Sequence, residues 1–289
     1  MGSYYRNLEL TENEESKLAY IQSNKFITLR SFHRKFLKNK TEAAAWYQLE
    51  KFCKFDPPLL ERLRGSHFEE RFYRLTAAAL KYLDFENRIL VRNPRFPNGM
   101  RAQSYEHDCR VIALRVSFEE NPDLMNVFWV SDFEMRTGVT PEIKAGFIAG
   151  KLNKTTWRYN RDKDLFHWKE GDLKGGPKNQ YPRTPDGYME ADLDGRREIF
   201  VFEYIHQSYS RQTLDRMVYQ LESDPVFSKG YKLIVSKNTE DAESLIPRLK
   251  ERVKEKEKWF VGDYERALTA PFKKVWFNLG KSELIPVEN

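Results

Sequence analysis

Two acidic residues, Asp186 and Glu203, are placed to act together, one on each side of a hairpin sequence. Between them lies Asp194-Gly195, a strong two-residue turn pattern, because a type I′ turn needs positive φ at both central positions. If that turn closes the hairpin, cross-strand partners have residue numbers that add up to 389, as Asp186 and Glu203 do. The two carboxylates would then be direct neighbours on one face, with Cβ atoms roughly 5 Å apart.

Two carboxylates at such a position need a compensating positive charge, since like charges opposite each other destabilise a sheet. Glu203 lies in IFVFEYI, an apolar and aromatic stretch that is typical of a buried strand. A carboxylate there is costly unless it is paired or bound to a metal, and a divalent cation with oxygen ligands would meet that need. A solvated sheet face, or neutralisation by an arginine or lysine, is the alternative interpretation.

The sequence around the hairpin predicts a domain of mixed helices and strands over residues 104–289. A helix with Ser104 as its candidate cap precedes the strand-like stretch NVFWVSDFEMR, and the hairpin follows. The remaining sequence predicts a helix, a strand, a charged helix and a last strand in SRQTLDRMVYQLES, YKLIVSK, AESLIPRLKERVKEKEKW and KKVWFNLG. The run KERVKEKEK is interpreted as the exposed face of the charged helix. Residues 137–181, which are polar and rich in lysine, glycine and aromatic residues, are interpreted as an insertion.

Residues 1–92 predict a separate, mostly helical domain that ends in a hairpin and a helix. Thr11 with Glu14 forms a capping-box pattern, and Thr41 is the expected cap of a later helix. The predicted helices lie in LTENEESKLAYIQ, LRSFHRKFL, TEAAAWYQLEKFCKF and TAAALKYL, and the hairpin in LLERLRGSHFEERFYRLT. Three helices followed by a hairpin are the order of a winged helix-turn-helix, whose second closely spaced helix enters the major groove. Residues 93–103, with two prolines and a glycine, are interpreted as a linker.

Positive charge is concentrated in this first domain. The whole chain has a net charge of +6, and residues 25–54 alone carry eight lysines and arginines against Glu42 and Glu50. Contacts of this kind with phosphates give affinity without sequence information. A solvated basic face, or one that docks on protein, is the alternative. The candidate DNA-binding residues are Arg34, Lys35, Lys38, Lys40, Thr41, Arg64 and Arg71.

Composition excludes several other classes of protein. With 40% hydrophobic residues, the chain can build a packed core and is not globally disordered. Cys53 and Cys109 match no metal-binding spacing and give no disulfide framework. The sequence contains no signal-peptide pattern and no apolar run long enough for a bilayer, so we expect a soluble, cytoplasmic protein.

The order helix, strand, hairpin, helix, strand resembles the α-β-β-β-α-β core of the PD-(D/E)xK, restriction-endonuclease-like nucleases. That resemblance implies an α+β or α/β chain in which an Asp at the second strand and a Glu in the third hold Mg²⁺ near the scissile phosphate. Pro185-Asp186 and Glu203 resemble those positions. A metal held by carboxylates can activate water and neutralise developing negative charge, as phosphodiester cleavage requires.

The chain departs from the nuclease signature at Ile205, where a lysine is expected two residues after the Glu. The lysine would orient the attacking water and stabilise charge. Its role could pass to His206, Gln207 or a lysine of the insertion, or the site could be inactive. A structural or solvated role for His206 is the simpler interpretation.

The combination of motifs is similar to the replication-relaxation family, which includes MobC-type relaxases of mobilisable plasmids. The matching stretches are RFYRLTAAALKYL, Glu106-His107-Asp108, WVSDFEMR with Glu134, Pro185-Asp186 and FVFEYIHQS with Glu203. The resemblance implies DNA processing on a mobile element, with Mg²⁺ or Mn²⁺ held by Asp186, Glu203 and Glu134. His107 and Asp108 are further catalytic candidates. The implied partners are double-stranded or partly single-stranded DNA and other plasmid-transfer proteins, and a homodimer is plausible.

No nucleophilic residue can be selected from the sequence. The five histidines are too scattered for a three-histidine metal site, and among 15 tyrosines Tyr181 and Tyr209 lie nearest the carboxylates in the chain. The leading hypothesis is a metal-dependent, relaxase-like DNA-nicking enzyme. A DNA-binding replication or transfer regulator with an inactive nuclease fold is the alternative, which Ile205 favours. A protein-docking role for the C-terminal domain is the third interpretation.

Overall fold

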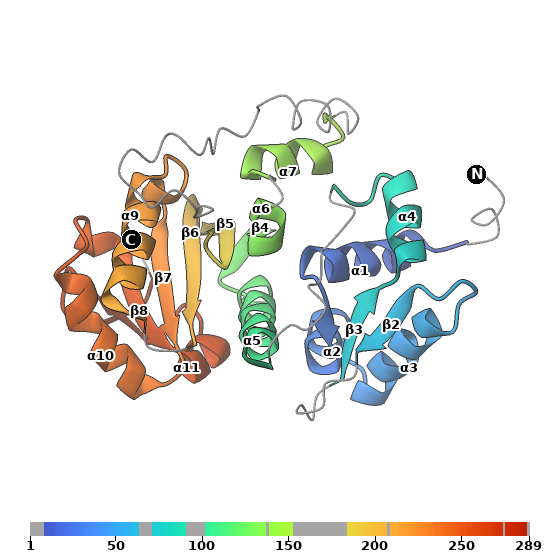
Figure 1. Cartoon of the computed structure of the whole chain (residues 1–289), viewed down its shortest axis with the longest axis horizontal. Coiled ribbons are helices and arrows are strands. Elements are labelled where there is room, and N and C mark those ends of the chain that lie inside the picture. Colours follow the sequence, from blue (N-terminus) through green and yellow to red (C-terminus); the bar gives the residue numbers. More distant parts are fainter. Residues whose placement is uncertain are drawn as a thin grey trace. The chain divides into compact units, whose positions relative to one another are not determined.

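A computed structural model describes residues 9–63, 71–90, 102–136, 139–152, 184–206, 209–273 and 275–287. The described residues form two compact units, and each is considered by itself (Figure 1). The first contains the described residues up to 112 together with 139–152, and the second contains the remainder. This division differs from the expected domains, because it falls inside the helix that follows the predicted linker. Most of that linker, and residues 153–181 of the predicted insertion, lie outside the described residues.

The first unit packs helices around a small antiparallel sheet with the strand order β1-β3-β2. The predicted hairpin is confirmed, since β2 pairs antiparallel with β3. The short strand β1 was not predicted, because two residues are too few to show a period. The elements are α1 (Glu12–Ser23), β1 (Ile27–Thr28), α2 (Leu29–Leu37), α3 (Glu42–Cys53), β2 (Leu60–Leu63), β3 (Phe72–Leu75), α4 (Ala77–Phe85) and α7 (Pro141–Ile148).

Threonine caps set the starts of the first four helices. Thr11, Thr28, Thr41 and Thr76 each accept a hydrogen bond from the backbone N–H three residues later. Such a cap satisfies one of the backbone donors that a helix start leaves without an intrahelical partner. The capping box of Thr11 and Glu14 is confirmed. These caps direct the apolar faces inward, and the core includes Leu18, Ile21, Phe32, Leu49, Phe52 and Tyr73, all with no exposed area.

The long helix α5 (Ala102–Glu119) belongs to both units. It begins before Ser104, so the expected cap at Ser104 is wrong, and His107 and Asp108 lie in the second turn rather than at the helix start. In the first unit, Ile112 of α5 joins a buried cluster with Phe26 and Phe72.

The second unit is built on a seven-stranded mixed sheet with the order β10-β9-β8-β7-β6-β5-β4. The pairs β6-β7 and β7-β8 are parallel, and all other pairs are antiparallel. The elements after α5 are β4 (Leu124–Ser131), α6 (Asp132–Arg136), β5 (Gly187–Leu193), β6 (Arg196–Ile205), α9 (Arg211–Ser223), β7 (Tyr231–Ser236), α10 (Thr239–Lys250), β8 (Trp259–Asp263), α11 (Tyr264–Thr269), β9 (Trp276–Asn278) and β10 (Glu283–Ile285). The described part of the chain is therefore mixed α and β with two sheets.

The predicted hairpin of β5 and β6 is confirmed in its turn and its register. Asp194 and Gly195 have φ of 50° and 79°, the positive values that a type I′ turn requires. Gly187 pairs with Phe202 and Leu193 with Arg196, so partner numbers add up to 389 throughout.

Helices cover the sheet with apolar side chains. Phe118, near the end of α5, contacts Phe202 of β6 and Phe272 with ring centroids 5.6 and 5.4 Å apart. On α9 the buried residues are Leu214, Met217, Val218 and Leu221, and α10 packs along β7 and β8. None of the helices in the described ranges is both long and apolar enough to cross a membrane.

Two predicted elements of the second unit were wrong. The stretch NVFWVSDFEMR is not a single strand, because β4 ends at Ser131 and α6 begins at Asp132. The predicted charged helix ends at Lys250, so KERVKEKEK is not its exposed face, and Trp259 opens β8 instead. All residues of β8 are buried, and pairing with β7 and β9 places Trp259, the last residue of the predicted helix, in a strand.

Candidate functional site

The structure brings Asp186 and Glu203 to the same position of the β5–β6 hairpin. Asp186 directly precedes β5, and the pairing of Gly187 with Phe202 puts it next in register with Glu203 of β6. The side chains are buried, with exposed fractions of 5% for Asp186 and 1% for Glu203. The sequence-based prediction of two neighbouring carboxylates in a buried sheet agrees with this register.

Asp186, directly before β5, is hydrogen-bonded to β6 and to the first residue of α6. Its Oδ2 atom accepts a hydrogen bond from the backbone N–H of Tyr204 at 2.8 Å, and its carbonyl accepts one from the N–H of Asp132 at 3.3 Å. The carboxylate is thereby fixed against β6, directly beside Glu203. Such a bond fixes the orientation of a carboxylate before any ligand arrives.

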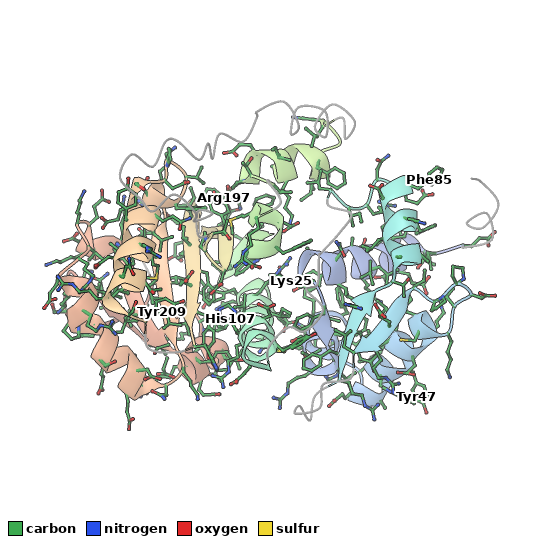
Figure 2. All side chains as sticks on the ribbon, viewed as in Figure 1. Lys25, Tyr47, Phe85, His107, Arg197 and Tyr209 are labelled. Carbon is green, nitrogen blue, oxygen red and sulfur yellow. The ribbon has the colours of Figure 1, made fainter. Side chains whose placement is uncertain are left out.

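Glu203 is oriented by a tyrosine that follows its strand. The hydroxyl of Tyr209 donates to Oε1 of Glu203 at 3.1 Å, and the carbonyl of Tyr209 accepts a hydrogen bond from the guanidinium of Arg248 on α10 (Tyr209 is labelled in Figure 2). Beside Tyr209 is a small hollow lined also by Ile205, Ser236, Asp241, Ser244, Leu245 and Arg248. The sequence pointed to Tyr209 by chain proximity alone, whereas Tyr181 lies outside the described residues.

Glu134 has a different role from the two hairpin carboxylates. Its Oε2 accepts hydrogen bonds from the N–H and the hydroxyl of Ser131 at 3.0 and 3.2 Å, and the N–H of Glu134 donates back to Ser131 Oγ at 3.3 Å. These reciprocal bonds form a capping box at the start of α6. Ser-Asp-Phe-Glu is the sequence pattern of such a box, so the sequence carried a signal for this role that the metal-site interpretation overlooked.

The three expected metal ligands do not form one cluster. Within the described ranges, no three His, Cys, Asp or Glu side chains are grouped so that they could hold a metal ion. The structure thus brings Asp186 together with Glu203 but does not add Glu134 to them. Two carboxylates still match the way Mg²⁺ is often bound, by one or two carboxylates plus substrate phosphates and water.

His107 and Asp108 take part in an ion pair of the first unit. The carboxylate of Asp108 lies 3.2 Å from Nζ of Lys25 and 3.3 Å from Nδ1 of His107. Burial alone would raise the pKa of Asp108, but the hydrogen bond from His107 and the charge of Lys25 outweigh burial, and the pKa lies below its usual value. These contacts connect α5 with the segment after α1.

The position expected for a catalytic lysine is apolar and buried. Ile205 ends β6 with an exposed fraction of 5%. The ring of the following His206 lies 6.2 Å from the ring of Tyr204, centroid to centroid. Gln207 and the lysines at 153–183 lie outside the described residues.

The described candidate DNA-binding residues lie on α2, in the turn after it and directly before β3. Lys38 and Lys40 are exposed in the turn between α2 and α3, while Thr41 caps α3. Lys35 places Nζ 5.4 Å from the ring centroid of Tyr20, and Arg34 lies beside it on α2. Arg71, just before β3, is exposed, whereas Arg64 lies outside the described residues.

Sequence reasoning missed an aromatic pair on α3, Trp46 and Tyr47. Ala45, Leu49 and Phe52 already form the buried stripe of this helix, all with no exposed area, which leaves Tyr47 66% exposed. The spacing of that stripe was the available signal, because an adjacent aromatic pair cannot lie wholly on one helix face.

Comparison with family models, curated proteins and solved structures finds no match to the chain. The resemblance to the replication-relaxation family therefore stays a prediction from the motifs.

Proposed function

We propose that the protein binds DNA through its first unit and nicks a phosphodiester with a divalent metal at Asp186 and Glu203. The observation that carries the proposal is the shared register of these two buried carboxylates on the β5–β6 hairpin. Two carboxylates brought together at one position offer the oxygen ligands that hard divalent cations prefer.

The order of elements supports this proposal in both units. If the short helix α6 and the helix α7 of the first unit are set aside, α5, β4, β5, β6, α9 and β7 follow the α-β-β-β-α-β order of restriction-endonuclease-like domains. In the first unit, α1, α2 and α3 precede the β2–β3 hairpin, as in a winged helix-turn-helix. The basic residues on α2 and in the turn after it would bind the DNA backbone.

The carboxylates fit a divalent cation in chemistry and in orientation. Tyr204 and Tyr209 donate to them through a backbone N–H and a phenol, and these hydrogen bonds orient the two carboxylates. Asp186 and Glu203 would hold Mg²⁺ or Mn²⁺, which when bound would activate water and neutralise charge at the phosphate.

A second candidate function is a DNA-binding replication or transfer regulator that cuts nothing. The apolar Ile205 at the expected lysine position favours this reading, as does the engagement of Glu134 in a capping box. Such a protein would bind duplex DNA with strong salt dependence and leave it intact in any divalent metal.

The two functions are separated by titrating Mn²⁺ into the full chain and by assaying supercoiled plasmid DNA for nicks in Mg²⁺ and Mn²⁺. Asp186→Asn and Glu203→Gln are expected to lose metal binding and nicking, because each removes one ligand charge but keeps the shape of the side chain. Glu190→Gln is the matched control, since Glu190 lies on the same hairpin and instead pairs with Arg197.

If both variants bind Mn²⁺ and nick like the wild type, the metal assignment is wrong. A wild type that binds duplex DNA but neither binds Mn²⁺ nor nicks would establish the regulator instead.

A further inference from the structure

The exposed face of α3 carries an aromatic surface. The rings of Trp46 and Tyr47 lie 4.8 Å apart, centroid to centroid, with an angle of 59° between their planes. Tyr47 is 66% exposed and extends from the helix (Figure 2). An exposed tyrosine beside a half-buried tryptophan gives stacking area that costs little conformational entropy to use, because each side chain has two χ angles.

This surface borders a hollow of about 480 Å³, within the range of roughly 300–1,000 Å³ of ligand pockets. Three aromatic and three charged side chains line it. It is lined by Trp46, Tyr47, Glu50, Lys51, Lys54 and Phe55. We call this set of six residues the α3 hollow.

The charge at the α3 hollow suits an anionic ligand. Its acidic residue, Glu50, is already paired with the guanidinium of Arg62 and accepts a hydrogen bond from the hydroxyl of Tyr73 at 3.3 Å. Lys51 places Nζ 5.7 Å from the ring centroid of Phe55 and is paired with Glu14 at 2.7 Å, whereas Lys54 is exposed one turn further. Lys54 therefore supplies exposed positive charge among the lining residues.

A third cation approaches from outside the helix. The guanidinium of Arg71 lies 5.9 Å from the ring centroid of Trp46. A cation over an aromatic face fixes the ring and adds positive potential next to it.

We propose that the α3 hollow binds an unpaired nucleobase, which stacks on Tyr47 and Trp46 while Lys54 contacts a flanking phosphate. This inference rests on the proposed DNA-binding function and deepens it to a preference for single-stranded or locally melted DNA. In a duplex, both faces of a base are covered by its neighbours, so a ring can stack on a base only where the base is unpaired. Rings interleaved with cations are how single strands are bound without sequence preference.

The test compares the full chain and its variants for binding to a fluorescein-labelled single strand of about 20 nucleotides and to the duplex of the same sequence, by fluorescence anisotropy at one salt concentration. Tyr47→Ala is expected to weaken single-strand binding by about 5- to 150-fold and duplex binding by less than about threefold. Tyr47→Phe, which keeps the ring, is expected to bind within about twofold of the wild type.

Tyr219→Ala is the matched control, because Tyr219 lies on α9 and is 61% exposed. It should change neither affinity. Both tyrosines are exposed, so thermal unfolding of each alanine variant should match the wild type.

Three outcomes would overturn the inference. Unchanged single-strand binding in Tyr47→Ala, or an equal loss on single strand and duplex, would refute the stacking of an unpaired base while leaving DNA binding in place. A wild type that binds neither DNA would instead refute the proposed function, and the inference with it.

Discussion

A buried lysine at the start of β7 is expected to make the stability of the second unit depend on pH. Lys232 is 1% exposed and donates through Nζ to the carbonyl of Ser228 at 2.8 Å. Burial, and then the charge of Lys258, lower the pKa of Lys232 to about 8, while Glu255 and Glu222 partly oppose the shift. Between that value and the ordinary pKa of an unfolded lysine, the unfolded chain holds a proton that the folded chain has released.

Stability therefore rises with pH across this window, by up to about 1.4 kcal/mol per pH unit. We predict that Lys232→Met, which keeps an unbranched side chain without the charge, is more stable than the wild type near neutral pH and lacks the rise. Urea unfolding at about pH 7 and about pH 9.5 measures both quantities. The exposed Lys229, replaced by Met, is the control and should keep the wild-type rise. Parallel pH profiles of Lys232→Met and wild type would contradict the prediction.

Close packing of Trp129 requires a glycine at position 187, beside the candidate metal site. A Cβ atom built on Gly187 would lie 2.2 Å from Cζ2 of Trp129, a contact that real side chains do not make. Trp129 is 4% exposed and holds the guanidinium of Arg115 5.6 Å from its ring centroid, so it has little room to move.

We predict that Gly187→Ala destabilises the protein by about 1–3 kcal/mol, the usual effect of overpacking, measured by urea unfolding. In combination with Trp129→Phe, part of the lost stability should be recovered, because the smaller ring of phenylalanine removes the clash. Gly146→Ala on α7 is the control, because its Cβ would meet its nearest neighbour at an ordinary 3.8 Å. Equal effects of Gly146→Ala and Gly187→Ala would show that close packing on Trp129 is not the cause.

At the scale of elements, the sequence predicted those structures whose determinants are local. The β5–β6 hairpin was predictable because Asp194 and Gly195 fix the turn and the turn fixes the register, and with it the pairing of Asp186 with Glu203. The strand β8 was not, because the charged stretch before Trp259 favours a helix and the strand is stabilised by pairing with β7 and β9.

The surroundings of the carboxylates could not be predicted for a related reason. The hydrogen bond from Tyr209 to Glu203 depends on how the chain turns after β6, and the bond from Arg248 to Tyr209 joins residues 39 positions apart. Neither contact has a periodic signature in the sequence. The capping box of Ser131 and Glu134 is local, so it could have been predicted from the sequence Ser-Asp-Phe-Glu.

At the scale of the whole molecule, the net charge of +6 is unevenly distributed along the chain. The stretch 25–54 has eight basic and two acidic residues, a net charge equal to that of the whole chain, so the other residues balance one another. Binding of DNA through this stretch would release counterions from the phosphates, and the affinity would fall with salt in proportion to the number of contacts.

We predict that replacing Lys38 and Lys40 together by alanine lowers the slope of log affinity against log salt by about 1.8 on duplex DNA, because two phosphate contacts are removed. The two side chains are exposed in the turn between α2 and α3, so the fold should be unaffected. The control replaces Lys254 and Lys256, an exposed pair with the same spacing in the second unit. Affinity is measured by anisotropy over a series of salt concentrations. If the control pair lowers the slope as much as Lys38 and Lys40 do, the charge acts through the whole molecule rather than through the first unit, and the DNA-binding face is wrongly placed.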